Sequence, residues 1–401
     1  MDFCGSIASV IHALAWFLIG YSDGLVYWLI NLTEITGYMV YITPVIIIYI
    51  IYLFMFCKIS LSTSLARRQI FFISFAIALF FFQIFSVGEI YTVGYIQVIV
   101  MIGVSFLITD LFKENEIILR PHFANGIITI HYIICFYAIF SWIILRVVGE
   151  DISLYIVDFD TLSGFAANRT SGLHREPSWA GYALASSYLG VLITRPNRLW
   201  LPQIAYLLAI GVTGAGAGLI MACVFIAQQV LINRRGNLVL RLGVLAVLGL
   251  LVLVVFSGRI SEVLNQNDPS SQMRLESTTV AAEVIAETFP IGTGFGNYQD
   301  HAIFDPTIWG GFLDISEATY YKSDVLALNF IAELGFFGIV LTILFIMNFS
   351  SRSNVLVFVA VMIMVLTSGT VIQPAYLVLA AIIGLERGRT AREAAGRDGT
   401  V

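Results

Sequence analysis

The chain has 401 residues, of which 59% are hydrophobic and 12% charged, with a formal net charge of -5 and a mean hydropathy of +0.90. This composition excludes an ordinary soluble domain, and apolar runs long enough to cross a hydrocarbon core of about 30 Å recur along nearly the whole length. The sequence therefore predicts an all-α, polytopic membrane protein, because a helix satisfies its own backbone hydrogen bonds in lipid.

The apolar runs predict about twelve membrane-spanning helices in one integral membrane domain, residues 1–386. The first run has neither a basic segment before it nor a small-residue cleavage site, so we interpret it as a span and not a signal peptide. The spans are expected at 7–30, 38–57, 70–88, 91–112, 123–147, 177–194, 199–212, 213–232, 238–256, 325–348, 354–370 and 371–386. The pair at 199–212 and 213–232 could instead be one kinked segment. The tail at 387–401 is basic, small and polar, and we expect it to be disordered and cytoplasmic.

Basic residues predict the orientation. With a cytoplasmic N-terminus, fifteen of the 21 Lys and Arg lie inside, eleven in loops and four in the tail, which predicts that both ends are cytoplasmic. The other six lie in or beside two long outer loops, at about 148–176 and 257–324; they are Arg146, Arg169, Arg175, Arg259, Arg274 and Lys322. Long loops on a compact bundle are where we expect the functional surface.

The end of the first loop, Asn168–Gly181, concentrates charge in an apolar chain (NRTSGLHREPSWAG). The proline after Glu176 suits the first turn of a helix, which places Glu176 at its start, where the helix dipole and Arg175 favour the ionised carboxylate. Glu176 is a candidate general base beside an anion-binding pair, Arg169 and Arg175, whose guanidinium groups match phosphate oxygens. Alternatively these residues only fix the loop onto the bundle. His174 could shuttle a proton or cap the loop.

The second loop contains a segment with helical spacing of its less polar residues, Leu275, Thr279, Ala282, Ile285 and Phe289. This spacing predicts an amphipathic helix near the membrane surface, ended by Pro290. Arg274 at its start is a candidate for the same anionic group, or part of a solvated face. Arg259 lies just outside a span, where it could bind the substrate or simply reach the lipid headgroups.

The second loop ends in a cluster of aromatic and charged residues. Tyr320 and Tyr321 could form a platform for sugar rings or an interfacial aromatic belt. Lys322 adds a cation, and Asp324 is a catalytic or sugar-binding candidate or a helix N-cap.

Glycine-rich segments are interpreted structurally. GTGFGN at Gly292–Asn297 does not match a dinucleotide-binding pattern and predicts a tight, close-packed turn. GVTGAGAG at Gly211–Gly218 predicts a close helix–helix contact. Charges within the spans are too few for the midplane sites that an ion-coupled transporter needs.

Three motifs together carry a resemblance. They are EPSWAG at Glu176–Gly181, the stretch from Arg274 to FPIGTGFGNY at Phe289–Tyr298, and SDVLALNFIAELGFFG at Ser323–Gly338. In order, spacing and topology, about residues 140–385 resemble the O-antigen polymerase (Wzy-type) and O-antigen ligase superfamily of GT-C-like membrane glycosyltransferases.

The chain differs from the superfamily pattern in two places, of which the first bears on the choice between ligase and polymerase and the second on the cations of the anion site. Ligases resemble one another in a His-Asn pair eleven residues before the helix glycine, where this chain has Asp324 and Val325. Polymerases often show Ser-Asp, and this chain has Ser323 and Asp324, which favours a polymerase. A Ser-Arg pair common near position 213 is replaced by Gly and Ala.

The resemblance implies a surface-glycan polymerase of the bacterial inner membrane, joining undecaprenyl-pyrophosphate-linked repeat units at the periplasmic face. It needs cations for the departing pyrophosphate, a role for Arg169, Arg175 and Arg274, and a base, Glu176 or Asp324, with His174 and His301 in reserve. We expect no metal, no cofactor besides the lipid-linked substrate and no nucleic-acid partner; a flippase and a chain-length regulator are possible partners. The alternatives are a ligase that transfers glycan to a lipid A-core acceptor and, from another class, a transporter or lipid flippase.

Overall fold

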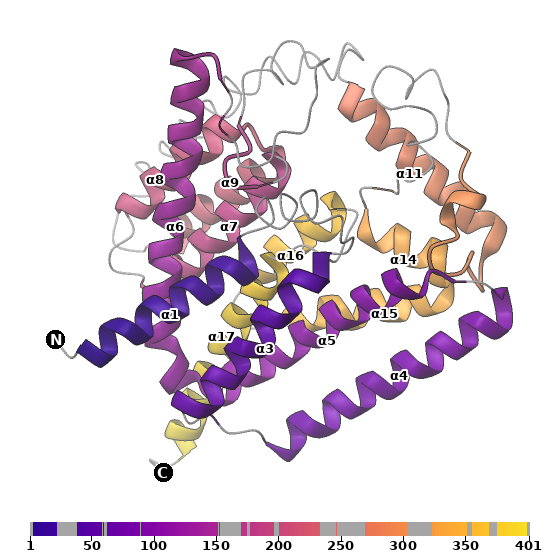
Figure 1. The fold of residues 1–401 in the computed structure, drawn as a ribbon, viewed down its shortest axis with the longest axis horizontal. Helices are drawn as coiled ribbons and strands as arrows, with labels where there is room; N and C mark the ends of the chain where they lie inside the picture. Colours follow the sequence, from indigo (N-terminus) through magenta and orange to yellow (C-terminus); the bar gives the residue numbers. More distant parts are fainter. Residues whose placement is uncertain are drawn as a thin grey trace.

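The computed structural model describes residues 3–21, 38–57, 59, 62–88, 90–150, 152, 170–174, 177–195, 200–232, 246, 269–303, 323, 325–350, 355–368 and 375–398. Within these ranges the regular elements are α-helices and one short 3-10 helix, with no strand, which confirms the all-α fold (Figure 1). Three described helices are long and apolar enough to cross a membrane, over Leu65–Val87, Thr92–Glu114 and Glu116–Val147, and shorter apolar helices accompany them. The total of twelve spans stays a prediction.

The first half of the chain holds α1 (Phe3–Gly20), α3 (Tyr38–Phe56), α4 (Thr63–Val87), α5 (Thr92–Glu114) and α6 (Glu116–Val147). The second half holds α7 (Pro177–Thr194), α8 (Trp200–Thr213), α9 (Gly216–Ile232), α11 (Pro269–Thr288), η2 (Tyr298–Asp300), α14 (Leu326–Leu334), α15 (Phe336–Phe349), α16 (Val355–Thr367) and α17 (Ala375–Asp398). The span expected at 238–256 lies outside the described residues except for position 246.

Two expectations are wrong in these ranges. The segment at 325–348 is not one helix, because Gly335, with φ of +58°, separates α14 from α15. The tail expected to be disordered from 387 continues α17 to Asp398. At 199–232 two helices, α8 and α9, flank Gly214, whose φ is +60°; whether they are two spans or one kinked segment stays open.

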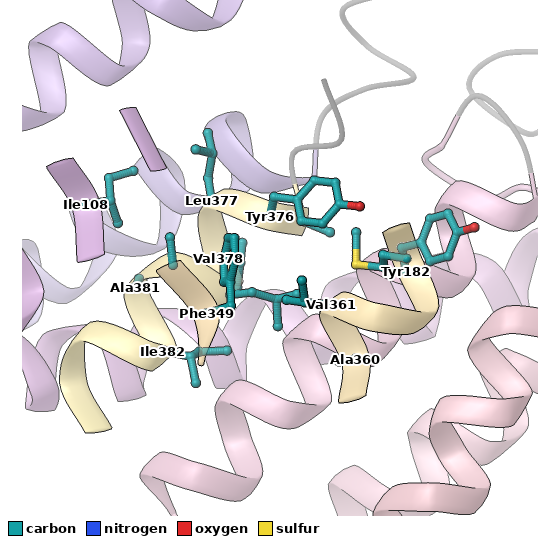
Figure 2. Close-up of a cluster of buried hydrophobic side chains, with 14 of the residues drawn as sticks. Ile108, Tyr182, Phe349, Ala360, Val361, Tyr376, Leu377, Val378, Ala381 and Ile382 are labelled. Atoms are coloured by element: carbon teal, nitrogen blue, oxygen red, sulfur yellow. The ribbon is translucent and has the colours of Figure 1, made fainter. Parts of the chain in front are cut away.

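The first half of α17 forms the centre of the bundle, with the apolar residues from Ala375 to Leu385 almost wholly buried. Figure 2 shows this core: Tyr376, Leu377, Val378, Ala381 and Ile382 of α17 lie with Ile108 of α5, Tyr182 of α7, Phe349 of α15 and Ala360 and Val361 of α16. By contrast α4, along one edge of the molecule in Figure 1, exposes Phe71 and Phe85, as expected of a lipid-facing helix.

Two glycines let α17 lie against the backbone of α5. A Cβ atom at Gly384 would come 2.5 Å from the Thr109 carbonyl oxygen, and one at Gly388 would come 2.5 Å from that of Lys113. Small residues four apart are the usual means of close helix approach in membranes.

A buried ion network holds the end of α17 beyond the apolar segment. The Glu386 carboxylate, 2% exposed, pairs with Arg120 of α6 at 3.2 Å and with Arg389 of α17 at 2.7 Å. Glu116 of α6, 4% exposed, pairs with Arg120 and, at 3.0 Å, with Arg392. These pairs with α6 explain why the helix persists where composition predicted disorder.

Candidate functional site

The end of the loop before α7, residues 170–174, is a buried segment between helices. Thr170, Ser171, Gly172, Leu173 and His174 are all buried. The Thr170 N–H donates to the Val212 carbonyl of α8 at 3.4 Å, and the His174 N–H donates to the Ser171 carbonyl at 3.1 Å. A Cβ on Gly172 would lie 3.3 Å from Cα of Ala138 on α6. The loop is therefore anchored directly before α7.

Helix α7 begins at Pro177, as predicted from the helix-start signal. It is buried from Trp179 to Val191. A Cβ on Gly218 of α9 would lie 2.9 Å from Cα of Gly181, which confirms the predicted close helix contact. The EPSWAG motif thus enters the bundle through a glycine–glycine contact.

The second motif forms a turn, Pro290–Gly296, that lies on the break between α14 and α15. The Thr293 N–H donates to the Ala332 carbonyl at 2.9 Å, and the Gly294 N–H donates to the Glu333 carbonyl at 3.0 Å. The Phe336 N–H returns a bond to the Pro290 carbonyl at 2.9 Å. The predicted tight turn is confirmed, and its partner is the third motif.

Steric fit makes this contact specific to glycine. A Cβ on Gly335 would collide with the Pro290 carbonyl oxygen, and one on Gly292 would come 2.6 Å from the Glu333 carbonyl oxygen. Both glycines also have positive φ, +58° and +84°, which other residue types adopt only at a cost. The two motifs therefore form one structural unit.

A buried carboxylate completes the unit. Glu333, 2% exposed, accepts the Gly296 N–H on Oε1 at 3.0 Å. Tyr298 is also fully buried, and its hydroxyl has no hydrogen-bond partner among the described residues. Burial, and after it the Glu333 carboxylate, raises the pKa of the Tyr298 phenol, which therefore stays protonated.

Helix α11 packs on α14 next to this turn (Figure 1). Val280, Ala281 and Val284 of α11 form a small core with Tyr298 and Ala332. The helix ends before Pro290, as predicted. Of the predicted stripe, Leu275 is 71% exposed and Phe289 is 48% exposed, whereas Ile285 packs against this small core. The placement of the helix at the membrane surface stays a prediction.

The start of α14 is organised by Ser323, which is fully buried. Its Oγ accepts the Val325 N–H at 3.1 Å, and its carbonyl accepts Nδ2 of Asn329 at 2.7 Å. These bonds hold the residue directly before α14, Val325, which is the N-cap and makes no side-chain cap bond, while the N-cap alternative for Asp324 lies outside the described residues.

Three predicted site residues lie in the described ranges. His174 is buried, Arg274 is exposed on α11, in its second turn and not its first, and His301 is exposed directly after η2. The others lie outside the described residues: Arg169, Arg175, Glu176, Arg259, Tyr320, Tyr321, Lys322 and Asp324. The structure joins the second and third motifs, whereas the meeting of the two outer loops stays a prediction.

Sequence reasoning missed the part of Glu333 in this unit. The sequence places Glu333 in the third motif, as the first residue of a Glu-x-Gly, and also as one of the few charges within the spans, but assigns it no role. The signal was the combination of a Glu-x-Gly with alternating glycines elsewhere, because a turn with positive φ exposes N–H groups that need an acceptor. Within the described ranges, no group of three His, Cys, Asp or Glu is arranged to hold a metal ion.

Comparison with known proteins gives one family. Residues 199–343 match the family model Wzy_C, described as O-antigen ligase. No match was found among curated proteins or among solved structures. The matched range includes α8, α9, α11, η2, α14 and the first part of α15, and so contains both halves of the turn unit. The match to the O-antigen ligase (Wzy_C) model over residues 199–343 confirms, for this part of the chain, the resemblance of this membrane protein to the O-antigen polymerase and ligase superfamily.

Proposed function

We propose that the protein is a polysaccharide polymerase that joins undecaprenyl-pyrophosphate-linked repeat units at the periplasmic face of the bacterial inner membrane. The observation that carries the proposal is the docking of Pro290–Gly296 on the α14–α15 break within the Wzy_C domain. Two motifs of the superfamily, separate in sequence, form one structural unit, which supports the glycan-transfer function of that superfamily. Ser323 and Asp324, in place of a His-Asn pair, favour the polymerase over the ligase.

The proposed transfer breaks the bond between the nascent glycan and its lipid pyrophosphate, and forms a glycosidic bond to a hydroxyl of the incoming unit. Arg169, Arg175 and Arg274 stabilise the negative charge of the departing pyrophosphate. Glu176 or Asp324 accepts the hydroxyl proton, with His174 or His301 as the other candidates. Arg259, Lys322, Tyr320 and Tyr321 bind the pyrophosphate or the sugars.

The buried position of His174 supports a role in positioning the loop more than a role as the base. Its backbone N–H bonds within the loop, and its neighbours Thr170 and Gly172 contact α8 and α6. The base is therefore better sought in Glu176 and Asp324, each placed next to the first residues of a helix whose dipole favours an anion.

The lipid-linked sugars of a deletion strain test the proposal against its rivals. Loss of a polymerase leaves surface lipid that carries a single repeat unit. Loss of a ligase leaves surface lipid without glycan, and loss of a flippase leaves lipid-linked units that are not accessible from the periplasm. Either of the last two outcomes overturns the polymerase.

Charge removal tests the pyrophosphate site. We expect Arg175→Ala to shorten the glycan at normal protein level, while Arg146→Ala has no effect, because Arg146 is exposed and lies over the Trp142 ring at 5.6 Å. Unchanged chain length with Arg175→Ala removes that residue from the site.

Metal independence is tested on purified protein with lipid-linked repeat units as substrate. We expect the activity to survive a chelator, because the proposed charge stabilisation comes from arginines. Loss of activity that a divalent cation restores would contradict this.

A further inference from the structure

The turn Pro290–Gly296 forms hydrogen bonds with residues in or next to four helices besides α11. It bonds to α14 and α15 as described, and the Phe295 carbonyl accepts the N–H of Tyr91, directly before α5, at 2.7 Å. On its other side, Nε2 of Gln83 of α4 donates to the Ile291 carbonyl at 3.5 Å. The turn therefore fixes the end of α11 to the bundle.

Glu333 holds the second half of this turn through both its backbone and its side chain. Its backbone carbonyl accepts the Gly294 N–H at 3.0 Å, and its carboxylate accepts the Gly296 N–H at 3.0 Å. The residue before it, Ala332, accepts the Thr293 N–H and also packs against α11. One short segment of α14 thus holds both the turn and the helix that precedes it.

This arrangement links two candidate site positions. Helix α11 carries Arg274, and α14 begins beside Ser323 and Asp324 and ends at Leu334. Helix α14 has nine residues and is about 13 Å long, so the contact at Glu333 and the start of α14 lie on one short helix, and α11 packs on the same helix. A displacement of about 1 Å at a reacting group is enough to cost about 100-fold in rate.

We infer that Glu333 is a positioning residue for the transfer reaction: by holding the Gly296 N–H it sets α11, and with it Arg274, relative to the start of α14. The inference rests on the proposed function and adds to it a residue that does not touch the substrate. A charge is not required for this role, because a side-chain amide oxygen accepts the same N–H.

The test compares Glu333→Gln, Glu333→Asp and Glu333→Ala in purified protein, with Glu287→Ala on the exposed face of α11 as the control. Polymerisation rates are measured per folded molecule, with kcat and KM separated, and hydrogen exchange is followed over residues 290–296. We expect Gln to keep kcat within about threefold, and Ala to lose protection of the turn and at least about tenfold in kcat. The Asp side chain is one methylene shorter, so we expect the kcat and the turn protection of Glu333→Asp to lie between those of the Gln and Ala variants. If Glu333→Ala does not fold, Glu333→Asp replaces it in the test.

A double variant shows whether Glu333 acts through Arg274. If it does, Arg274→Ala combined with Glu333→Ala lowers kcat little more than Arg274→Ala alone, because interacting residues are not additive. Additive losses, or a variant that loses protection of the turn but keeps the wild-type kcat, overturn the inference. A wild-type protein without polymerase activity overturns the proposed function instead, while the exchange data still test the contact at Glu333.

Discussion

Gly335 has an unusual backbone conformation and also a contact that leaves no room for a side chain. The conformational and the steric contributions to the free energy of unfolding can be separated by substitution. The φ of Gly335 is +58°, and a Cβ would collide with the Pro290 carbonyl oxygen. Gly149 also has positive φ, +81°, but has nothing within 4 Å of a Cβ. We expect Gly149→Ala to cost about 1 kcal/mol from conformation alone, and Gly335→Ala to cost about 3 kcal/mol or more. Thermal unfolding in detergent measures the difference, and equal shifts in Tm would contradict the steric part.

Glu386 and Glu393 allow a comparison between a buried and an exposed ion pair on the same helix. Glu386→Ala removes a carboxylate that is 2% exposed and pairs with Arg120 and Arg389, whereas Glu393, 58% exposed, has a long pair with Arg389 at 3.7 Å. Breaking a buried pair costs about 3 kcal/mol, and a surface pair is worth about 1 kcal/mol or less. We therefore expect a clear fall in Tm for Glu386→Ala and almost none for Glu393→Ala. Similar Tm values would show that the network adds no stability.

The packing of α17 on α5 depends on helix backbones coming close, and this is a property of whole helices. Gly384→Leu places a side chain where Cβ alone comes 2.5 Å from the Thr109 carbonyl, so the helices must move apart. We expect this variant to lose protein yield and protease resistance in membranes. Gly211→Leu on α8 is the control, because nothing lies within 4 Å of its Cβ, and its yield should match the wild type. Equal yields of the two variants would show that α17 does not need the close approach.

Helix ends with local signals could be predicted from the sequence, and those that depend on distant residues could not. Pro177 and Pro290 mark the start of α7 and the end of α11 by their own chemistry. The break at Gly335 was missed because apolar residues continue on both sides, and its cause, the Pro290 carbonyl, is distant in sequence. The helix beyond Glu386 was missed for the same reason, since its partners Glu116 and Arg120 lie on α6.

The candidate site shows the same division. The motifs that form the scaffold were found from their sequence, including the glycine turn and the Glu-x-Gly. The contact between them was not predicted, because spacing along a chain does not say which backbone N–H groups meet which acceptors. The sequence also did not indicate which face of α11 packs: Val280, Ala281 and Val284 form a core with Ala332 of α14, and Leu275 and Phe289 remain exposed.

The expected number of spans predicts on which side of the membrane Glu150 and Glu393 lie, and this can be tested. Seven expected spans lie between residues 150 and 393, counting α14 and α15 as one crossing and including 238–256. An odd number of crossings puts Glu150 and Glu393 on opposite sides of the membrane, with Glu150 outside. If the segment at 238–256 does not cross, or if instead α8 and α9 together make a single crossing, the number is six and both residues lie on the same side.

Both positions are exposed and suit cysteine labelling. In a chain whose four native cysteines are replaced by alanine, a membrane-impermeant maleimide should label Glu150→Cys in spheroplasts and Glu393→Cys only after lysis. Labelling of both in spheroplasts, or of neither, would refute the odd number of crossings. Labelling of Glu393→Cys alone in spheroplasts would show the opposite orientation. The second long loop, with Arg274 and the turn at Pro290–Gly296, would then lie in the cytoplasm, where it could not take part in a periplasmic transfer reaction.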